Sequence, residues 1–346
     1  MLGPSRRDLA LTGGGTALDV SVLVAAWNAE ATIGRAVRSA LDQRDIGVEV
    51  IVVDDASDDG TAACLASLAA AEPNLRVLRQ PRNTGPAAAR NRALDLATAP
   101  WITILDADDT MAPDRLRHLI EIARKGSWDI VADDLWKIDS HAPGTPRYRL
   151  WSDGKIGTRT LSFADFVAGN LSEQSSHRGE LGFLKPLIRR DVLDCHGLRY
   201  REDMRLGEDY ALYAAALAHG ARACLTDPCG YFALVRPESL SGCHDAAALR
   251  GLAEADHTLA TLPGLDRADR AILRVHNRET QKRWRWMRLI EAVHRRDARD
   301  ALGCFATSPA VAAWLVGQLV EQAWLRGKRR LQSLIRADAA RSDRRT

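Results

Sequence analysis

Short apolar runs rich in β-branched residues alternate with helical patterns from residue 19 to about residue 134. Four runs are typical of buried strands: VSVLVAA, VEVIVVDD, LRVLRQ and WITIL. Each is followed by apolar residues at helical spacing. This alternation predicts an α/β fold with a mostly parallel sheet covered by helices on both sides. Such sheets bind ligands beyond the carboxyl ends of their strands, so polar residues there are candidate site residues.

The predicted helices have recognisable start and stop signals. One covers residues 61–71, and Ser57 or Asp58 is expected to cap it. Another has Pro113 in its first turn and stops at Gly126. Beyond about residue 245 the chain has the pattern of helices with arginine-rich faces.

Composition excludes several classes of protein. The 346 residues are 46% hydrophobic and 27% charged, with a net charge of +3, which excludes a disordered, collagenous or fibrous chain. The longest apolar stretch, VSVLVAAW, is well short of the roughly 18 residues that span a bilayer. The six cysteines form no CxxC pair, so we expect reduced thiols in a cytoplasmic protein and no zinc site.

Carboxylates gather at two predicted strand ends. Asp54 and Asp55 end the second strand, and Asp106, Asp108 and Asp109 end the fourth in the string LDADD. Clustered like charges cost stability unless a cation lies among them. Oxygen ligands suit Mg²⁺ or Mn²⁺, which hold a diphosphate with one or two protein carboxylates. The alternative is that these acids only cap the helices that follow.

A second acidic pair, Glu208 and Asp209, opens a predicted helix in the string LGEDY. Acids at a helix start often only compensate the helix dipole. Beside a metal–diphosphate site, one of them becomes a candidate general base that takes the proton from a sugar hydroxyl. One base and a single displacement would invert the anomeric centre.

Four strings, in order and spacing, resemble the family 2 glycosyltransferases, which have the GT-A fold: VSVLVAAWNAEATIGRAVRSALDQ, VIVVDDASDDGT, NTGPAAARNRAL and ITILDADD. The later strings RGELGFLKPLIRR, MRLGEDYALYAAALAHGA and VRPESLSGCH resemble the branch that builds bacterial exopolysaccharides such as succinoglycan. The resemblance implies a catalytic domain over 19–245, with a nucleotide-binding half (19–135) and an acceptor half (136–245). A flexible leader (1–18) and a helical region with a basic tail (246–346) are expected to flank it.

The resemblance assigns several residues to the donor nucleotide. Trp27 stands where the family usually has Tyr and is expected against the uracil of a UDP-sugar, with Glu30 near the nucleoside. Asp55 matches the acid that hydrogen-bonds the uracil, and Asp54 is its neighbour. Arg90 resembles the basic residue that reaches toward the nucleotide.

Other matched residues concern the metal ion. Asp106 and Asp108 match the DxD pair, the first expected near the ribose and the second on Mg²⁺ or Mn²⁺. Asp109 makes the register of this pair ambiguous and is a second candidate ligand. His244 lies where some relatives place a third ligand, although a single histidine is more often structural.

The resemblance also implies the catalytic base and a single transfer step. Asp209 matches the base, with Glu208 beside it. The string QKRWRW has the letters of the processive QxxRW motif but the wrong spacing. We therefore expect transfer of one residue at a time and interpret Trp284 and Trp286 as packing residues.

The C-terminal helix combines an apolar face with a basic end. The face bears Trp314 and Trp324, and the basic cluster that follows consists of Arg326, Lys328, Arg329 and Arg330. Such a helix either lies on an anionic bilayer surface or docks on the catalytic domain, and both alternatives stay open. We expect no nucleic-acid partner, because aromatic residues do not interleave with these charges.

Together these features predict an inverting, non-processive hexosyltransferase. It would move a sugar, expected to be glucose, from a UDP-sugar to a growing lipid-linked exopolysaccharide repeat unit, with peripheral contact at the inner face of the cell membrane. The alternatives are a catalytically silent nucleotide-sugar-binding scaffold and a nucleotidyltransferase, although AAWNAE lacks the Gly-rich loop that holds a triphosphate. Asn170, Glu180 and Lys185 are candidate contacts to the sugar, but the sequence does not assign them.

Overall fold

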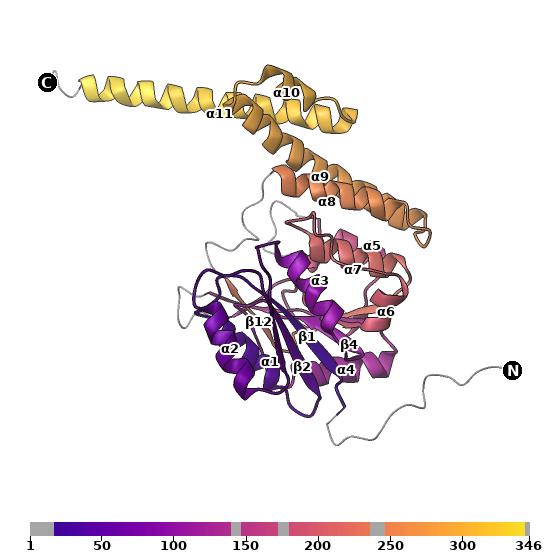
Figure 1. The fold of residues 1–346 in the computed structure, drawn as a ribbon. Helices are drawn as coiled ribbons and strands as arrows, with labels where there is room; N and C mark the ends of the chain where they lie inside the picture. The colour runs from indigo at the N-terminus through magenta and orange to yellow at the C-terminus, as the bar shows by residue number, and fades with distance from the viewer. Residues whose placement is uncertain (1–16, 140–146, 172–179, 236–245, 343–346) are drawn as a thin grey trace.

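The computed structural model describes residues 17–139, 147–171, 180–235 and 246–342. Their strands form two sheets (Figure 1). The larger sheet consists, in spatial order, of β3 (Leu75–Arg79), β2 (Val48–Asp54), β1 (Val20–Ala26), β4 (Trp101–Ile104), β10 (Leu187–Arg189), β6 (Ile130–Asp133), β11 (Ala223–Thr226) and β9 (Arg159–Thr160). The smaller sheet consists of β5 (Thr110–Met111), β12 (Tyr231–Val235), β7 (Trp136–Asp139) and β8 (Tyr148–Arg149).

The four strands from β3 to β4 are all parallel. Strand β2 is buried along its whole length, as expected for a strand covered on both faces. Its one charged interior residue, Glu49, is satisfied there, because its Oε1 accepts hydrogen bonds from the Ser21 and Thr98 hydroxyls at 2.6 and 2.7 Å. The carboxyl ends of β1, β2 and β4 therefore meet at one edge of the sheet.

Strand β10 is inserted antiparallel between β4 and β6. The insertion brings a segment from the second half of the chain to the middle of the sheet, directly beside β4. In the smaller sheet, β12 pairs antiparallel with β5, which follows the LDADD string. Both pairings carry residues from far along the sequence to the end of β4.

Helices of the α/β body, described over residues 17–139, 147–171 and 180–235, flank the larger sheet (Figure 1). They are α1 (Ile33–Leu41), α2 (Thr61–Ala71), α3 (Pro86–Leu96), α4 (Arg115–Gly126), α5 (Phe163–Ala168), the 3₁₀ helix η2 (Leu181–Phe183), α6 (Arg190–Cys195) and α7 (Glu208–Ala218). The predicted α/β architecture, with its strands and the helices of the first half, is confirmed. The predicted cap of α2 is wrong: this helix has no side-chain cap, and the Ser57 hydroxyl instead accepts a hydrogen bond from the Asn28 N–H at 3.0 Å.

The described residues after the α/β body form four helices: α8 (Ala246–Ala260), α9 (Arg267–His294), α10 (Ala298–Gly303) and α11 (Pro309–Ser342). Helix α8 contacts α7, α9 packs on α8, and α11 packs on α9 and extends away from the body (Figure 1). The Trp286 and Trp314 rings meet edge to face with centroids 6.3 Å apart, which supports a packing role for Trp286. None of the helices in the described part of the chain combines the length and apolar character that crossing a membrane requires.

Candidate active site

The carboxyl ends of β1, β2 and β4 place the predicted acidic residues at a common edge. The Asp55 N–H donates to the Ala26 carbonyl at 2.8 Å, and the Leu105 N–H donates to the Leu23 carbonyl at 3.0 Å. Asp106 follows at once, so the acids after β2 and β4 emerge on either side of β1. Parallel pairing of the strands produces this arrangement.

Asp55 organises the loop that leads into α3. Its Oδ1 accepts hydrogen bonds from the Thr84 N–H and the Gln80 amide, both at 2.8 Å, and its Oδ2 accepts one from the Gly85 N–H at 2.7 Å. Asp54 is buried beside it and accepts from the Ser57 N–H at 3.0 Å. A contact of Asp55 with a nucleobase stays a prediction.

Trp27 and Glu30 lie in the loop between β1 and α1. Trp27 is 52% exposed, which leaves its ring accessible to a ligand. The Glu30 carboxylate accepts a hydrogen bond from the Gly60 N–H at 3.0 Å, and the Glu30 N–H donates to Asp59 at 3.1 Å. Glu30 thus ties this loop to the start of α2, and its role toward a nucleoside stays a prediction.

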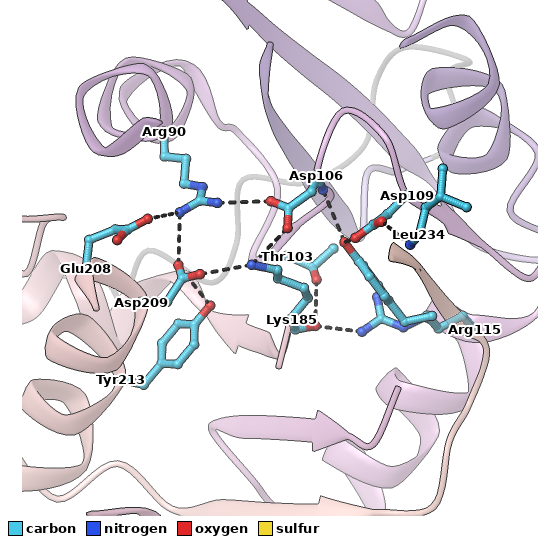
Figure 2. A network of polar contacts seen from close by, with 11 residues as sticks. Arg90, Thr103, Asp106, Asp109, Arg115, Lys185, Glu208, Asp209, Tyr213 and Leu234 are labelled. Carbon is cyan, nitrogen blue, oxygen red and sulfur yellow. Dashed lines mark hydrogen bonds and ion pairs between the residues drawn. The ribbon is translucent and has the colours of Figure 1, made fainter. Parts of the chain in front are cut away.

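Arg90, on α3, joins carboxylates from both halves of the chain (Figure 2). Its Nη1 donates to Glu208 at 2.9 Å and to Asp209 at 3.2 Å, and its Nη2 donates to Asp106 at 2.9 Å. The guanidinium is buried and lies over the Tyr200 ring at 5.5 Å. The predicted donor residues Arg90 and Asp106 and the predicted base therefore share one charge network. It lies at the carboxyl edge of the parallel strands, the crevice in which sheets of this kind bind ligands.

Lys185 is the second cation of this crevice, and Figure 2 shows it between the two acidic groups. Its Nζ lies 2.9 Å from Asp209 Oδ2 and 3.1 Å from Asp106 Oδ2. Burial alone would raise the pKa of Asp106, but Lys185 and Arg90 lower it to about 2. Asp106 is therefore a carboxylate at neutral pH.

Glu208 and Asp209 form the first turn of α7, which begins after Gly207 with φ of +76°. The glycine supplies the left-handed backbone that turns the chain into the helix. Both acidic side chains are buried, at 9% and 7% exposure. Burial raises the pKa of Glu208, an effect that Arg90 opposes and that neighbouring Asp209 reinforces.

Asp109 lies beside the crevice and forms hydrogen bonds with uncharged groups. Its Oδ2 accepts from the Tyr231 hydroxyl and its Oδ1 from the Leu234 N–H, both at 2.8 Å. Burial, followed by the charges of Asp106 and Asp108, raises the pKa of Asp109 to about 8. With this pKa, Asp109 is mostly protonated at neutral pH, and its role as a metal ligand stays a prediction.

The LDADD string offers a half-buried carboxylate, that of Asp108, to a divalent cation. Asp106, at the same edge of the sheet, is paired with Lys185 and Arg90. A single carboxylate is sufficient for Mg²⁺ or Mn²⁺ when a diphosphate supplies further oxygens. Within the described ranges no group of three or more His, Cys, Asp or Glu side chains could hold a metal by itself. His244 lies outside the described residues.

Sequence reasoning left two residues of this region without a role. Lys185 comes from the segment before β10, and Tyr231 begins β12. No local pattern indicates either role, because both depend on the strand pairings that bring these segments to β4. Asn170, by contrast, is structural: its side chain donates to the Phe166 carbonyl and accepts from the Gly182 N–H, both at 2.7 Å.

Comparison with known proteins identifies relatives over most of the chain. The family model "Glycosyl transferase family 2" matches residues 21–196. The succinoglycan biosynthesis protein ExoU of Rhizobium meliloti is 40% identical over 303 residues, which cover 87% of each chain. The succinoglycan biosynthesis protein ExoO of the same organism is 38% identical over 226 residues, covering 64% of this chain and 62% of the relative.

Solved structures share the fold at lower identity. S. aureus TarS 1–349 in complex with UDP-GlcNAc has a TM-score of 0.60 at 16% identity, covering 82% of this chain and 89% of that one. The mannosyltransferase PcManGT from Pyrobaculum calidifontis, in complex with GDP-Man and Mn²⁺, has a TM-score of 0.54 at 18% identity, covering 88% of this chain and 80% of that one. Both are glycosyltransferase folds, and their bound nucleotides differ.

Proposed function

The chain belongs to glycosyl transferase family 2, and from that premise we propose an inverting, non-processive transfer of one sugar from a UDP-sugar to a saccharide hydroxyl. The family and the similarity to ExoU identify a glycosyltransferase whose relatives act in exopolysaccharide biosynthesis. The single observation that carries the finer proposal is the crevice in which Arg90 bridges Asp106 to Glu208 and Asp209.

We propose Asp209 as the general base of this reaction. The acceptor hydroxyl oxygen bonds to the anomeric carbon while Asp209 takes its proton. The bond from the anomeric carbon to the diphosphate breaks, and its electron pair leaves with the nucleotide. Because a single displacement inverts the centre, the product has the opposite anomeric configuration. Glu208, whose pKa burial raises, is the neighbouring candidate for the same proton.

The donor would lie along the edge formed by the ends of β1, β2 and β4. Trp27 and Asp55, with Glu30 and Asp54 beside them, would hold the nucleoside, while Asp106 and Arg90 face the ribose and diphosphate. The Arg90 Nε is buried and has no hydrogen-bond partner in the described part of the chain, which supports a ligand nearby. UDP and UDP-GlcNAc complexes of TarS favour a uridine nucleotide.

Asp108 is the residue that we propose to hold Mg²⁺ or Mn²⁺, with Asp109 and His244 as further candidates. A bound divalent cation would neutralise charge on the departing diphosphate. The side chains of this protein meanwhile orient the acceptor, remove its proton and hold the ribose. The PcManGT complex with Mn²⁺ supports the choice of ion.

The experiment that tests the proposed function is a panel of labelled nucleotide sugars incubated with the protein and a membrane extract. UDP-glucose is the donor expected to label a lipid-linked saccharide, with inversion at the anomeric carbon. Labelling from GDP-mannose alone would contradict the UDP-sugar assignment. Tight UDP binding with no turnover of any sugar in the panel would instead favour a catalytically silent scaffold. Pyrophosphate release from a nucleoside triphosphate would favour a nucleotidyltransferase.

We propose that the helical region over 246–346 brings the enzyme to a lipid-linked acceptor at the inner face of the cell membrane. Val320 and Trp324 on α11 are each 63% exposed, and Val316 is 51% exposed on the same helix face. The last 21 residues carry eight Lys and Arg against two Asp, while the rest of the chain sums to −3. An apolar face beside concentrated positive charge suits anionic lipid better than a second copy of the chain. Flotation with phosphatidylglycerol vesicles, compared with phosphatidylcholine alone, tests this contact.

A further inference from the structure

Lys185 lies between Asp209, on α7, and Asp106, after β4 (Figure 2). Its side chain is 7% exposed, and its Nζ is within hydrogen-bond distance of Asp209 and of Asp106. A lysine is rarely buried unless it is paired, and this one has a carboxylate on each side. Coulomb attraction to Asp106 and Asp209 outweighs burial and raises the pKa of Lys185, so it stays charged and does not itself act as a base.

The backbone fixes this lysine in place. Its carbonyl accepts hydrogen bonds from Arg115 Nη2 at 2.6 Å and from the Thr103 hydroxyl at 3.3 Å. Arg115 is itself fully buried and paired with Asp133 at 2.7 Å. Strand β10 begins two residues later, between β4 and β6. The ammonium group is therefore presented to the crevice from a rigid support.

Lys185 makes the shorter of the two cation contacts to the Asp209 carboxylate. Its Oδ2 contacts the Lys185 Nζ, whereas its Oδ1 accepts from Arg90 at 3.2 Å and from the Tyr213 hydroxyl at 3.5 Å. Arg90 divides its donors among three carboxylates. The charged and titratable groups that face Asp209 are Arg90 from α3, Lys185 from the segment before β10, Glu208 and Tyr213 from α7, Tyr200 from the segment before α7, and Asp106 beyond Lys185.

We propose that Lys185 is a positioning residue of the transfer reaction, which holds Asp209 as an oriented carboxylate at the acceptor side of the crevice. The inference rests on the proposed function, because Asp209 acts there as the base. Without the ammonium group, Asp209 would face Glu208 and Asp106 with only a shared arginine to balance them. Two like charges would then face its carboxylate, which would also have lost the contact that fixes its orientation.

Lys185→Met removes the charge with little change in length, and Lys185→Arg keeps the charge. The assay is UDP release from UDP-glucose with a membrane extract as acceptor, followed as a pH profile, together with UDP affinity measured by calorimetry. Lys155→Met, at an exposed lysine of the α/β body, is the matched control. For Lys185→Met we expect a fall in kcat of about tenfold or more. We also expect the acid limb of the profile to move to higher pH, with UDP affinity close to wild type.

A loss of UDP affinity in parallel with the rate, with an unmoved acid limb, would show that Lys185 is a donor ligand and would overturn the proposal. Wild-type activity of Lys185→Met would also overturn it. If the methionine variant does not fold, Lys185→Arg decides: an acid limb at the wild-type position supports the proposal, and a limb that moves contradicts it. Adding Lys185→Met to Asp209→Asn must cost no further rate, because a positioning residue acts through the residue it positions. Full activity of Asp209→Asn alone would instead refute the assignment of the base.

Discussion

Lys185 links two buried groups of charges: its backbone carbonyl contacts one, and its ammonium group belongs to the other. The two groups differ in net charge. Arg115 and Asp133 form a pair of one cation and one carboxylate, both side chains at 0% exposure. In the crevice, three carboxylates share the two cations Arg90 and Lys185. The first group is complete without a ligand, whereas the second carries one negative charge more than its cations neutralise.

The difference separates a structural role from a chemical one. A balanced buried pair is costly to break, because removal of one partner leaves the other charge unpaired and out of water. A cluster with carboxylates in excess keeps an acceptor that can take a proton, and perturbed groups of this kind gather at functional sites. We therefore expect changes in the crevice to lower activity, and changes in the Arg115–Asp133 pair to lower stability.

The largest expected effect is that of Asp209→Asn in the crevice. The amide keeps the shape of the side chain but cannot accept the acceptor's proton, so we expect kcat to fall by about 10²–10⁴-fold. Steady-state UDP release measures this fall, and circular dichroism measures the fold. Asp203→Asn, at an exposed carboxylate before the same helix, is the control and should leave kcat unchanged. If Asp209→Asn stays active while Glu208→Gln does not, Glu208 is the base.

Arg115→Met should have the next largest effect, and on stability. Asp133 would remain buried without its partner, so we expect the free energy of unfolding to fall by about 3–5 kcal/mol. Urea denaturation measures this change. Arg117→Met lies on the same helix in a partly exposed pair with Glu121 and should leave the free energy of unfolding nearly unchanged. Equal losses from the two variants would contradict the distinction between the buried pair and the surface pair.

The two groups also differ in how far the sequence predicts them. Local patterns are sufficient for β1, for α2 and for the carboxylates after β2 and β4, because strand and helix periodicities are properties of neighbouring residues. The resemblance to the family adds Arg90 and Asp209, which the structure brings into one crevice. The sequence leaves Lys185 as an unassigned candidate contact to the sugar, since its place beside Asp209 arises from the antiparallel insertion of β10 beside β4.

The predicted cap of α2 is wrong for a related reason. Ser57 has the chemistry of an N-cap, but its hydroxyl accepts a hydrogen bond from the Asn28 N–H in the neighbouring loop. A contact between residues 29 positions apart overrides a local preference. Hydrogen bonds that depend on tertiary neighbours, such as those of Tyr231 to Asp109, are equally invisible to a local pattern.

Asp109 belongs to neither of the two charged groups, because its hydrogen-bond partners, the Tyr231 hydroxyl and the Leu234 N–H, are uncharged. Its pKa, raised to about 8 by burial and then by Asp106 and Asp108, means that the folded state holds this proton more tightly than the unfolded chain. The contribution to stability is therefore fully present below about pH 4 and is lost as the pH rises through about 8. We expect the free energy of unfolding to fall by up to about 1.4 kcal/mol per pH unit in that window.

Denaturation at a series of pH values, with a chelator present, measures this slope. Asp109→Asn removes the titrating group and keeps an acceptor for Tyr231, so its slope in the same window should be flatter. The pH dependence that Asp106 gives to stability has the opposite sign. Because its pKa is about 2, its contribution to stability is present above about pH 4 and is lost as the pH falls through 2. Parallel curves for Asp109→Asn and wild type would show that Asp109 is ionised in the folded protein.

The smallest expected effect concerns the other face of α7, where Tyr210 follows the acidic pair. Its hydroxyl donates to Asp256 at 2.8 Å, Asp256 lies 2.8 Å from His276 Nδ1, and the Tyr210 and His276 rings stack at 4.7 Å. This buried group joins α7 to α8 and α9. Tyr210→Phe keeps the ring and leaves Asp256 with His276, so we expect a loss of about 1–2 kcal/mol in the free energy of unfolding.

Tyr148→Phe, at a tyrosine that is 48% exposed, is the matched control and should change neither stability nor rate. The kcat of Tyr210→Phe should stay close to wild type, because the contacts of Asp209 to Arg90 and Lys185 do not pass through this hydroxyl. A fall in kcat comparable to that of Lys185→Met, without unfolding, would contradict the separation between groups that set stability and groups that set activity. It would mean that the C-terminal helices set the position of α7, and that the orientation of the base depends on α8 and α9 as well as on the cations of the crevice.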